Sequence, residues 1–396
     1  MRLLVIVNVF EPDLGGGVLF SDLCYGLAER GFEVTVRCAS SYYPEWRDKS
    51  GENGLRIRSE TRRGVRIERF GLYIPRNPQA LHERLIYEGS FGASLMRRLP
   101  RRGDYDAMMV FCPLLGAVAY AAACRRKTGL PLWLNVQDLP AEAAQAGGIG
   151  QGSWMVRVQD ALFNKADVWS TISPTMIERL EPRRRRDQPL LYLPNWLHES
   201  LARHLETAPK TQGPGSPVRL LYSGNLGTKQ NLLELCCILH RSDAPFAFRI
   251  QAEGSSAGAL RKWAEETGDE RFDVRGLSDE KELARALHEA DFVVIPERSG
   301  AGGSFLPSKL IPALAAGTPV LAVCDADSPL GTEMTAHRPG PRFAWPEAEN
   351  LPALLKSVDQ NEYAAWKANA AKRAAFYDRD RVLDRYAEEL RRMDRR

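Results

Sequence analysis

Three glycine-rich turns, two of them followed by a lysine, occur where an apolar strand pattern passes into a helical one. The first is Pro12-Asp13-Leu14-Gly15-Gly16-Gly17, the second runs from Tyr222 to Asn231, and the third from Ile295 to Leu310. Glycines let the backbone come close to a ligand, and the helix that follows presents free N–H groups and the positive end of its dipole. These turns therefore suit an anion such as a phosphate. The first is not a GxGxxG motif, and a flexible turn is its open alternative.

The second and third turns place a basic side chain near those amides. Lys229 follows Gly224 and Asn225, whereas Lys309 lies one turn after the Gly302–Phe305 segment. A compact ammonium beside backbone amides forms a nest for an anion. An isolated loop lysine is more often surface decoration, and capping by Ser308 would explain part of the third turn.

Metal-binding residue types form no such pattern. The six histidines make neither an HxH nor an HExxH spacing, and the seven cysteines are scattered except for Cys236 and Cys237. Adjacent helical residues point to different faces, so this pair is neither a metal knuckle nor a redox pair. We expect no metal cofactor, and reduced thiols in the cytoplasm.

The elements that position these turns alternate between apolar strands and amphipathic helices. This alternation predicts an α/β chain with two open parallel sheets, and a 396-residue chain is long enough for two domains. A stretch rich in proline and glycine, 208–217, predicts a linker. The expected division is residues 1–205, a linker at 206–217, residues 218–363, and C-terminal helices at 364–396.

One uncharged stretch, Ala107 to Cys124, is long enough to suggest a transmembrane helix. Pro113 and Gly116 interrupt it, and its two halves differ in character. Residues 107–112 are typical of a buried strand, and residues 115–124 form an alanine-rich helical pattern. We therefore predict a strand followed by a helix.

The charge balance says more about partners than about the fold. A formal net charge of +4 is small for this length and argues against nucleic-acid binding. Residues 81–102 predict an amphipathic helix that ends in a cluster of arginines, and its apolar face, Leu81, Leu85, Phe91 and Leu95, suits either an anionic membrane or ordinary core packing. A solvated surface is the alternative for the arginines. The members of this candidate membrane and acceptor cluster are Arg97, Arg98, Arg101 and Arg102.

Several short motifs, in their order and spacing, resemble family 4 of the retaining glycosyltransferases, and the bacterial colanic-acid and exopolysaccharide type in particular. The resemblance covers nearly the whole chain. Its carriers are Tyr42-Tyr43-Pro44-Glu45-Trp46, Tyr73-Ile74-Pro75-Arg76-Asn77-Pro78, Gln137-Asp138, Thr171-Ile172-Ser173-Pro174, Pro194-Asn195-Trp196, Tyr222-Ser223-Gly224-Asn225-Leu226-Gly227 and Leu306-Pro307-Ser308-Lys309-Leu310 before Ala315-Ala316-Gly317.

The resemblance implies the GT-B fold, in which two Rossmann-like, doubly wound domains face each other across a cleft. It also implies transfer of a sugar from a UDP- or GDP-sugar to a lipid-linked or saccharide acceptor, in the cytoplasm or on the inner face of the cytoplasmic membrane. Lys229 and Asp138 are the implied catalytic residues. The implied donor and phosphate contacts are Gly15, Gly16, Gly17, Gly224, Asn225, Gly254, Leu277, Arg298, Gly303, Ser304, Phe305, Leu306 and Lys309.

The chain departs from the family pattern at three positions. Many members carry two glutamates eight positions apart that bind the sugar and the ribose; a gapless match places Ser304 and Pro312 there. Asn225 stands where the family has a diphosphate-binding arginine, and Arg298 is a candidate substitute. Two alternatives to transfer therefore stay open: a catalytically weak or inactive nucleotide-sugar-binding relative, and a sugar-nucleotide epimerase. Asp138 has its own alternative, the cap of a following helix.

Overall fold

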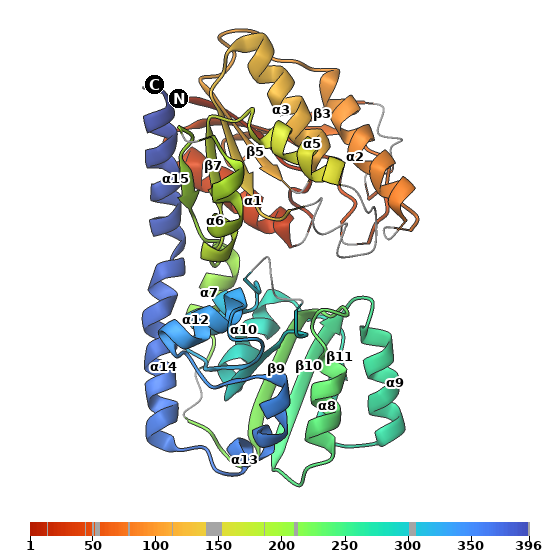
Figure 1. Cartoon of the computed structure of the whole chain (residues 1–396), viewed down its shortest axis with the longest axis vertical. Coiled ribbons are helices and arrows are strands. Elements are labelled where there is room, and N and C mark those ends of the chain that lie inside the picture. Colours follow the sequence, from red (N-terminus) through yellow and green to blue (C-terminus); the bar gives the residue numbers. More distant parts are fainter. Residues whose placement is uncertain are drawn as a thin grey trace. The chain divides into compact units, whose positions relative to one another are not determined.

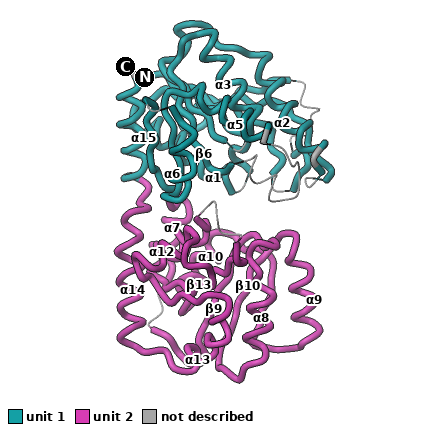
Figure 2. Tube along the Cα trace, viewed as in Figure 1, with its two compact units in different colours: residues 1–195, 380–396 teal, residues 196–379 magenta. Residues whose placement is uncertain are grey.

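The computed structural model describes residues 1–394 except 14, 44, 50, 52–55, 78–79, 113, 140–152, 186, 210–212 and 301–305. The chain forms two compact units (Figure 2). The first contains residues 1–195 and 380–396, and the second contains residues 196–379.

The first unit is built on an eight-stranded sheet in the order β3-β4-β2-β1-β5-β6-β7-β8 (Figure 1). All neighbouring strands are parallel except β3 and β4. The strands are β1 (Arg2–Ile6), β2 (Glu33–Ala39), β3 (Arg58–Arg62), β4 (Val65–Phe70), β5 (Ala107–Cys112), β6 (Leu132–Val136), β7 (Val168–Thr171) and β8 (Leu190–Tyr192). The helices are α1 (Gly16–Glu29), α2 (Leu81–Met96), α3 (Leu115–Thr128), α5 (Ser153–Phe163), α6 (Pro174–Leu180) and α15 (Arg379–Asp394).

The second unit is built on a six-stranded parallel sheet in the order β11-β10-β9-β12-β13-β14. Its strands are β9 (Val218–Asn225), β10 (Phe246–Glu253), β11 (Phe272–Arg275), β12 (Phe292–Pro296), β13 (Val320–Val323) and β14 (Arg342–Phe343). Its helices are α7 (Glu199–Thr207), α8 (Leu232–His240), α9 (Ala257–Thr267), α10 (Glu280–Glu289), α11 (Leu310–Ala316), α12 (Pro329–His337), α13 (Leu351–Lys356) and α14 (Gln360–Ala374).

Burial explains which strands the sequence revealed. Every residue of β5 is buried, because a central parallel strand is covered on both faces and therefore reads as an apolar run. Every residue of β3 is exposed, since this strand forms the antiparallel edge of the sheet, and its polar residues show no apolar pattern that would predict a strand. The predicted split of residues 107–124 into strand and helix is confirmed by β5 and α3. No helix within the described ranges is both long and apolar enough to cross a membrane.

The division into units differs from the expected one at both crossings of the chain. Residues 199–205 were expected in the first domain and 206–207 in the linker, but α7 packs on α10 in the second unit and buries Leu201 and Leu205 there. Helix α14 also packs in the second unit, through Tyr363 and Trp366. Only residues 380–396 join the first unit again. The proline and glycine content of 208–217 suggested a linker, but the apolar face of α7 determines where the second unit begins.

Candidate active site

Each sheet has a switch point between two neighbouring strands. From one of these strands the chain continues toward one edge of the sheet, and from the other it continues toward the opposite edge. In the second unit it lies between β9 and β12, and in the first between β1 and β5. Ligands of open α/β sheets bind outside the carboxyl ends of the strands at such points. The second and third glycine-rich turns leave β9 and β12, and the first turn follows β1. The topology therefore brings the two lysine-bearing turns of the second unit to one edge of its sheet.

Two glycines at this edge are required by the backbone. Gly224 has φ +130° and Gly254 has φ +129°, in the region that favours glycine. A Cβ atom on Gly254 would lie 2.5 Å from both the Leu226 carbonyl oxygen and Asn225 Oδ1, so the turns after β9 and β10 are in close contact. A Cβ atom on Gly224 would lie 3.0 Å from Lys309 Cε. Gly224 thus leaves the space that the lysine side chain occupies.

Lys309 joins the third turn to the second. Its Nζ donates a hydrogen bond to the Asn225 carbonyl oxygen at 3.3 Å and lies 4.9 Å from the centre of the Tyr222 ring. Burial lowers the pKa of the Lys309 ammonium to about 8. Within the described part of the chain, no carboxylate forms an ion pair with it. A half-buried ammonium that only a carbonyl and a ring contact is suited to hold an anion.

The remaining predicted donor residues are placed as follows. Lys229 is exposed, and its carbonyl accepts a hydrogen bond of 2.7 Å from the Arg298 N–H, which joins the two turns through their backbones. The Arg298 side chain is exposed, Leu306 is half-buried, and Leu277 after β11 is 50% exposed. Gly303, Ser304 and Phe305 lie outside the described residues.

Glu297, which sequence reasoning missed, is the first residue after β12. Its side chain is buried; Oε2 accepts a hydrogen bond of 3.0 Å from the Ser328 hydroxyl, and Oε1 has no hydrogen-bond partner among the described atoms. Burial raises the pKa of the Glu297 carboxyl to about 7, and the nearby Asp325 carboxylate adds to the rise. Asp325 in turn accepts hydrogen bonds from the Ser299 hydroxyl and the Gly300 N–H. The third turn thus begins between two acidic side chains.

The first glycine-rich turn is held by a buried carboxylate. Asp13 Oδ1 accepts hydrogen bonds from the Ser41 hydroxyl at 2.5 Å and from the backbone N–H groups of Tyr42 and Tyr43, both at 3.1 Å. Burial raises the pKa of Asp13, and these donors oppose the rise. The structure thus connects Asp13 to Tyr42-Tyr43. Gly15, with φ +64°, precedes α1, and Gly16 and Gly17 begin it; their predicted phosphate contact stays a prediction.

A chain of side-chain hydrogen bonds runs along the carboxyl end of β6. The Tyr386 hydroxyl and Asn135 Nδ2 are 2.8 Å apart, Gln137 Nε2 donates to Asn135 Oδ1 at 2.6 Å, and Asn195 Nδ2 donates to Gln137 Oε1 at 3.2 Å. Tyr386 also stacks on Trp133, with ring centres 5.4 Å apart. Asp138 is half-buried and accepts from the Leu139 N–H at 2.8 Å. Residues 140–152 lie outside the described ranges, and so does the alternative role of Asp138 as the cap of a following helix.

The arginine cluster does not form one uniform surface. Arg97, Arg101 and Arg102 are exposed. Arg98 is partly buried: its side chain lies 3.3 Å from the buried Glu68 carboxylate, and its carbonyl accepts hydrogen bonds from Arg37 and Tyr120. Arg98 therefore stabilises the fold at this position, unlike the more exposed Arg101 and Arg102.

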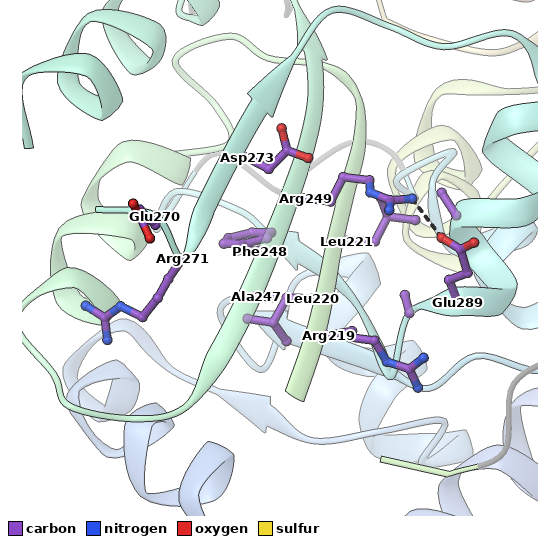
Figure 3. A pocket seen from close by; sticks show the side chains of 12 residues that line it. Arg219, Leu220, Leu221, Ala247, Phe248, Arg249, Glu270, Arg271, Asp273 and Glu289 are labelled. Carbon is purple, nitrogen blue, oxygen red and sulfur yellow. Dashed lines mark hydrogen bonds and ion pairs between the residues drawn. The ribbon is translucent and has the colours of Figure 1, made fainter. Parts of the chain in front are cut away.

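A cavity of about 170 Å³ lies in the second unit, toward the amino ends of strands β9 and β10 (Figure 3). Arg219 and Ala247, which line it, are the second residues of β9 and β10. Arg249 pairs with Glu289 at 3.0 Å, and Arg219 with Asp291 at 2.6 Å. This cavity is thus lined by neutralised arginines and lies away from the carboxyl ends. Among the described residues, no group of three or more His, Cys, Asp or Glu side chains is arranged to hold a metal ion.

Comparison with known proteins gives two likenesses in sequence. Residues 15–196 match the family described as the glycosyl transferase 4-like domain. The chain is 27% identical to WcaI of Escherichia coli (strain K12), named as a candidate colanic acid biosynthesis glycosyl transferase, over 99% of this chain and 100% of that protein.

Solved structures are similar over nearly the full length. Sucrose-phosphate synthase from Thermosynechococcus elongatus has a TM-score of 0.71 at 16% identity and covers 99% of this chain and 98% of its own. Alr3699/HepE from Anabaena, in complex with UDP and glucose, has a TM-score of 0.64 at 15% identity and covers 98% of this chain and 99% of its own. A structure described as trehalose-6-phosphate from E. coli bound with UDP-2-fluoro glucose has a TM-score of 0.71 at 11% identity. This likeness covers 98% of this chain and 99% of that chain. These likenesses show the GT-B fold.

Proposed function

We propose, from the premise that the chain is a glycosyltransferase of the family-4 type with the GT-B fold, that its second unit binds the diphosphate of a nucleotide sugar and its first unit binds the acceptor. One observation carries this proposal: Lys309 lies at the β9/β12 switch point with its ammonium on the Asn225 carbonyl and unpaired by any described carboxylate. A diphosphate would supply the missing negative charge.

The donor is proposed to be a UDP- or GDP-sugar. The Anabaena structure holds UDP and glucose, and the E. coli structure holds UDP-2-fluoro glucose, which favours UDP. Leu277, half exposed after β11, offers an apolar surface to the base. Pro312 lies in the first turn of α11, where a backbone N–H would have no partner within the helix. The helix that follows the third turn therefore tolerates this departure from the family pattern.

The proposed reaction is transfer with retention of the anomeric configuration. The bond between the anomeric carbon and the diphosphate oxygen breaks, and the acceptor hydroxyl oxygen forms the new bond on the face that the diphosphate leaves. Lys309 and Lys229 stabilise the negative charge that develops on the departing diphosphate; such preorganised groups contribute about 3 kcal/mol each. Asp138 orients the sugar or accepts the hydroxyl proton. The proposal requires no metal ion.

The acceptor is proposed to be a lipid-linked or polysaccharide chain in bacterial surface-polysaccharide synthesis. The likeness to WcaI, whose name refers to colanic acid biosynthesis, supports this class. The place of action would be the cytoplasm, on the inner face of the cytoplasmic membrane.

The proposal is tested by a thermal-shift screen with UDP, GDP, ADP and TDP, followed by incubation with UDP- and GDP-sugars. We expect one diphosphate to raise Tm, and the matching sugar nucleotide to release nucleotide faster when acceptor is added. Epimerised donor, or no shift with any diphosphate, would contradict transfer. Lys229→Ala should lower turnover by more than threefold; a smaller change would remove this lysine from the mechanism.

A further inference from the structure

Large apolar side chains that remain exposed are concentrated in the first unit. Among the described residues, seven such side chains are at least 36% exposed, and six of them belong to the first unit. Exposed large apolar side chains that gather on neighbouring elements often mark a contact with a protein or a membrane. We call these six the α2–α5 surface, since five of them lie on those two helices: Tyr73, Leu85, Ile86, Met96, Trp154 and Val158.

One helix supports both parts of this surface. Helices α2 and α5 each pack against α3, and right-handed crossovers place all three on the same face of the sheet (Figure 1). Helices α2 and α3 cross closely, because a Cβ atom on Gly116 would lie 2.2 Å from the Glu88 carbonyl oxygen. The two exposed stripes are therefore held on one rigid support.

The exposed side chains are not required by the core. On α2 the inward positions are Tyr87, Phe91 and Leu95, all nearly fully buried, and the outward Leu85 and Ile86 are 53% and 49% exposed. On α5, Gln159 and Phe163 are buried, and Trp154 and Val158 lie one turn apart, 61% and 45% exposed. The apolar face predicted for residues 81–102 is thus divided, and the core uses only one part.

The charges beside these stripes are mainly positive. Arg76, Arg84 and Arg157 are exposed. Helix α2 has two acidic side chains: Glu83 accepts hydrogen bonds from the Tyr73 hydroxyl at 3.1 Å and from the backbone N–H groups of Arg76 and Asn77. Glu88 accepts one from the Leu115 N–H at 2.7 Å. A surface of aliphatic and aromatic side chains with arginines around them complements the boundary between the headgroups and acyl chains of an anionic bilayer.

We propose that the α2–α5 surface docks the protein on an anionic lipid bilayer, with Trp154, Val158, Leu85 and Ile86 entering the interface and Arg84 and Arg157 contacting lipid phosphates. The inference rests on the proposed function in one respect: docking would bring a lipid-linked acceptor to the first unit. It assigns the membrane contact to two helices, in place of the arginine cluster at 97–102.

The test uses the full chain and vesicles of phosphatidylcholine with or without phosphatidylglycerol. We expect sedimentation with the anionic vesicles, and at least fivefold less bound protein for Trp154→Ser/Val158→Ser and for Leu85→Ser/Ile86→Ser. The matched control is Leu277→Ser, the one exposed large apolar side chain described in the second unit, which should bind vesicles as the wild type does. Arg157→Glu should reduce binding, and Lys281→Glu, exposed on α10, should not.

Equal sedimentation of wild type and all surface variants, or none with anionic vesicles, would overturn docking. Light scattering supplies a further criterion. If the wild type is a dimer and Trp154→Ser makes it a monomer, the α2–α5 surface binds a second copy of the chain, and membrane docking is refuted. The UDP thermal shift separates this inference from the proposed function. A normal shift without vesicle binding would refute docking alone, and vesicle binding without any nucleotide shift would refute donor binding alone.

Discussion

The carboxyl edges of the two sheets differ in how their polar side chains are satisfied. In the first unit, Asn135, Gln137, Asn195 and Tyr386 hydrogen-bond to one another in a chain. In the second unit, Lys309 has a carbonyl and an aromatic ring but no described carboxylate, and Glu297 leaves one oxygen without a described partner. The first chain consists of neutral groups, of which Asn195 Oδ1 has no described partner, whereas the second edge keeps the Lys309 ammonium without a described counter-ion.

This difference supports the proposal that the second unit binds the anion. A buried charge without a partner costs free energy that folding alone does not recover, so its retention is typical of a functional site. At the first edge, hydrogen bonds among neutral groups stabilise the position of Gln137, the neighbour of Asp138, before any ligand binds. The following predictions test this contrast.

The largest effect is expected for Lys309→Ala. Loss of the ammonium should lower kcat/KM for the donor about 100-fold, as for other preorganised groups that stabilise a leaving anion. The variant should melt at or above the wild-type Tm, because it removes a desolvated charge. Steady-state kinetics and calorimetry measure both, with Lys281→Ala as a control that should alter neither. Wild-type turnover in Lys309→Ala would show that the unpaired ammonium at the second edge has no role in the reaction.

A second effect concerns Glu297→Gln and the dependence of stability on pH. Burial raises the pKa of Glu297 from 4.5 to about 7, so the folded protein keeps a proton that the unfolded chain has lost. The stability from this group is therefore complete below pH 4.5 and is lost as pH rises through 7, by about 3 kcal/mol in all. Glutamine does not ionise, and the variant should be more stable than the wild type at pH 8.5 and similar at pH 4.5. An equal difference at both values would exclude titration of Glu297 as the cause.

A third effect is the pH dependence of diphosphate affinity. The pKa of Lys309 is about 8, and only its charged form attracts a diphosphate, so UDP affinity should be constant below that value and fall above it. The expected loss from pH 7 to pH 9 is about tenfold. Titration calorimetry measures it, and Lys309→Met should bind weakly with no such slope. A slope that persists in the methionine variant would assign the titration to another group.

The smallest effect is expected in the first unit, for Tyr386→Phe. The change removes the hydroxyl that is 2.8 Å from Asn135 and keeps the ring stacked on Trp133. We expect the free energy of unfolding to fall by about 1 kcal/mol in a denaturant titration. The UDP thermal shift should be unchanged, because the two lysines proposed to hold the diphosphate, Lys229 and Lys309, belong to the second unit. A lost shift would mean that the two edges do not act separately.

The sequence predicted those features that local patterns determine. Buried parallel strands such as β5 appear as apolar runs, and the turns after β1, β9 and β12 are visible in their glycines. Glu297 was missed because its burial comes from distant residues: Ser328 donates to its carboxyl, and the Trp345 indole N–H donates to its carbonyl at 2.6 Å. Tyr386 and Asn135 are 251 positions apart. Contacts of this range leave no trace in local periodicity.

The return of residues 380–396 to the first unit has a consequence for synthesis of the protein. Trp133 and Asn135 obtain the Tyr386 ring and hydroxyl only from this last segment, after all 184 residues of the second unit have been translated (196–379). Domains commonly fold in the order in which they leave the ribosome. Here the N-terminal sheet emerges first, but Trp133 and Asn135 on β6 stay uncovered until α15 has been synthesised. A nascent chain would thus complete its second unit before its first.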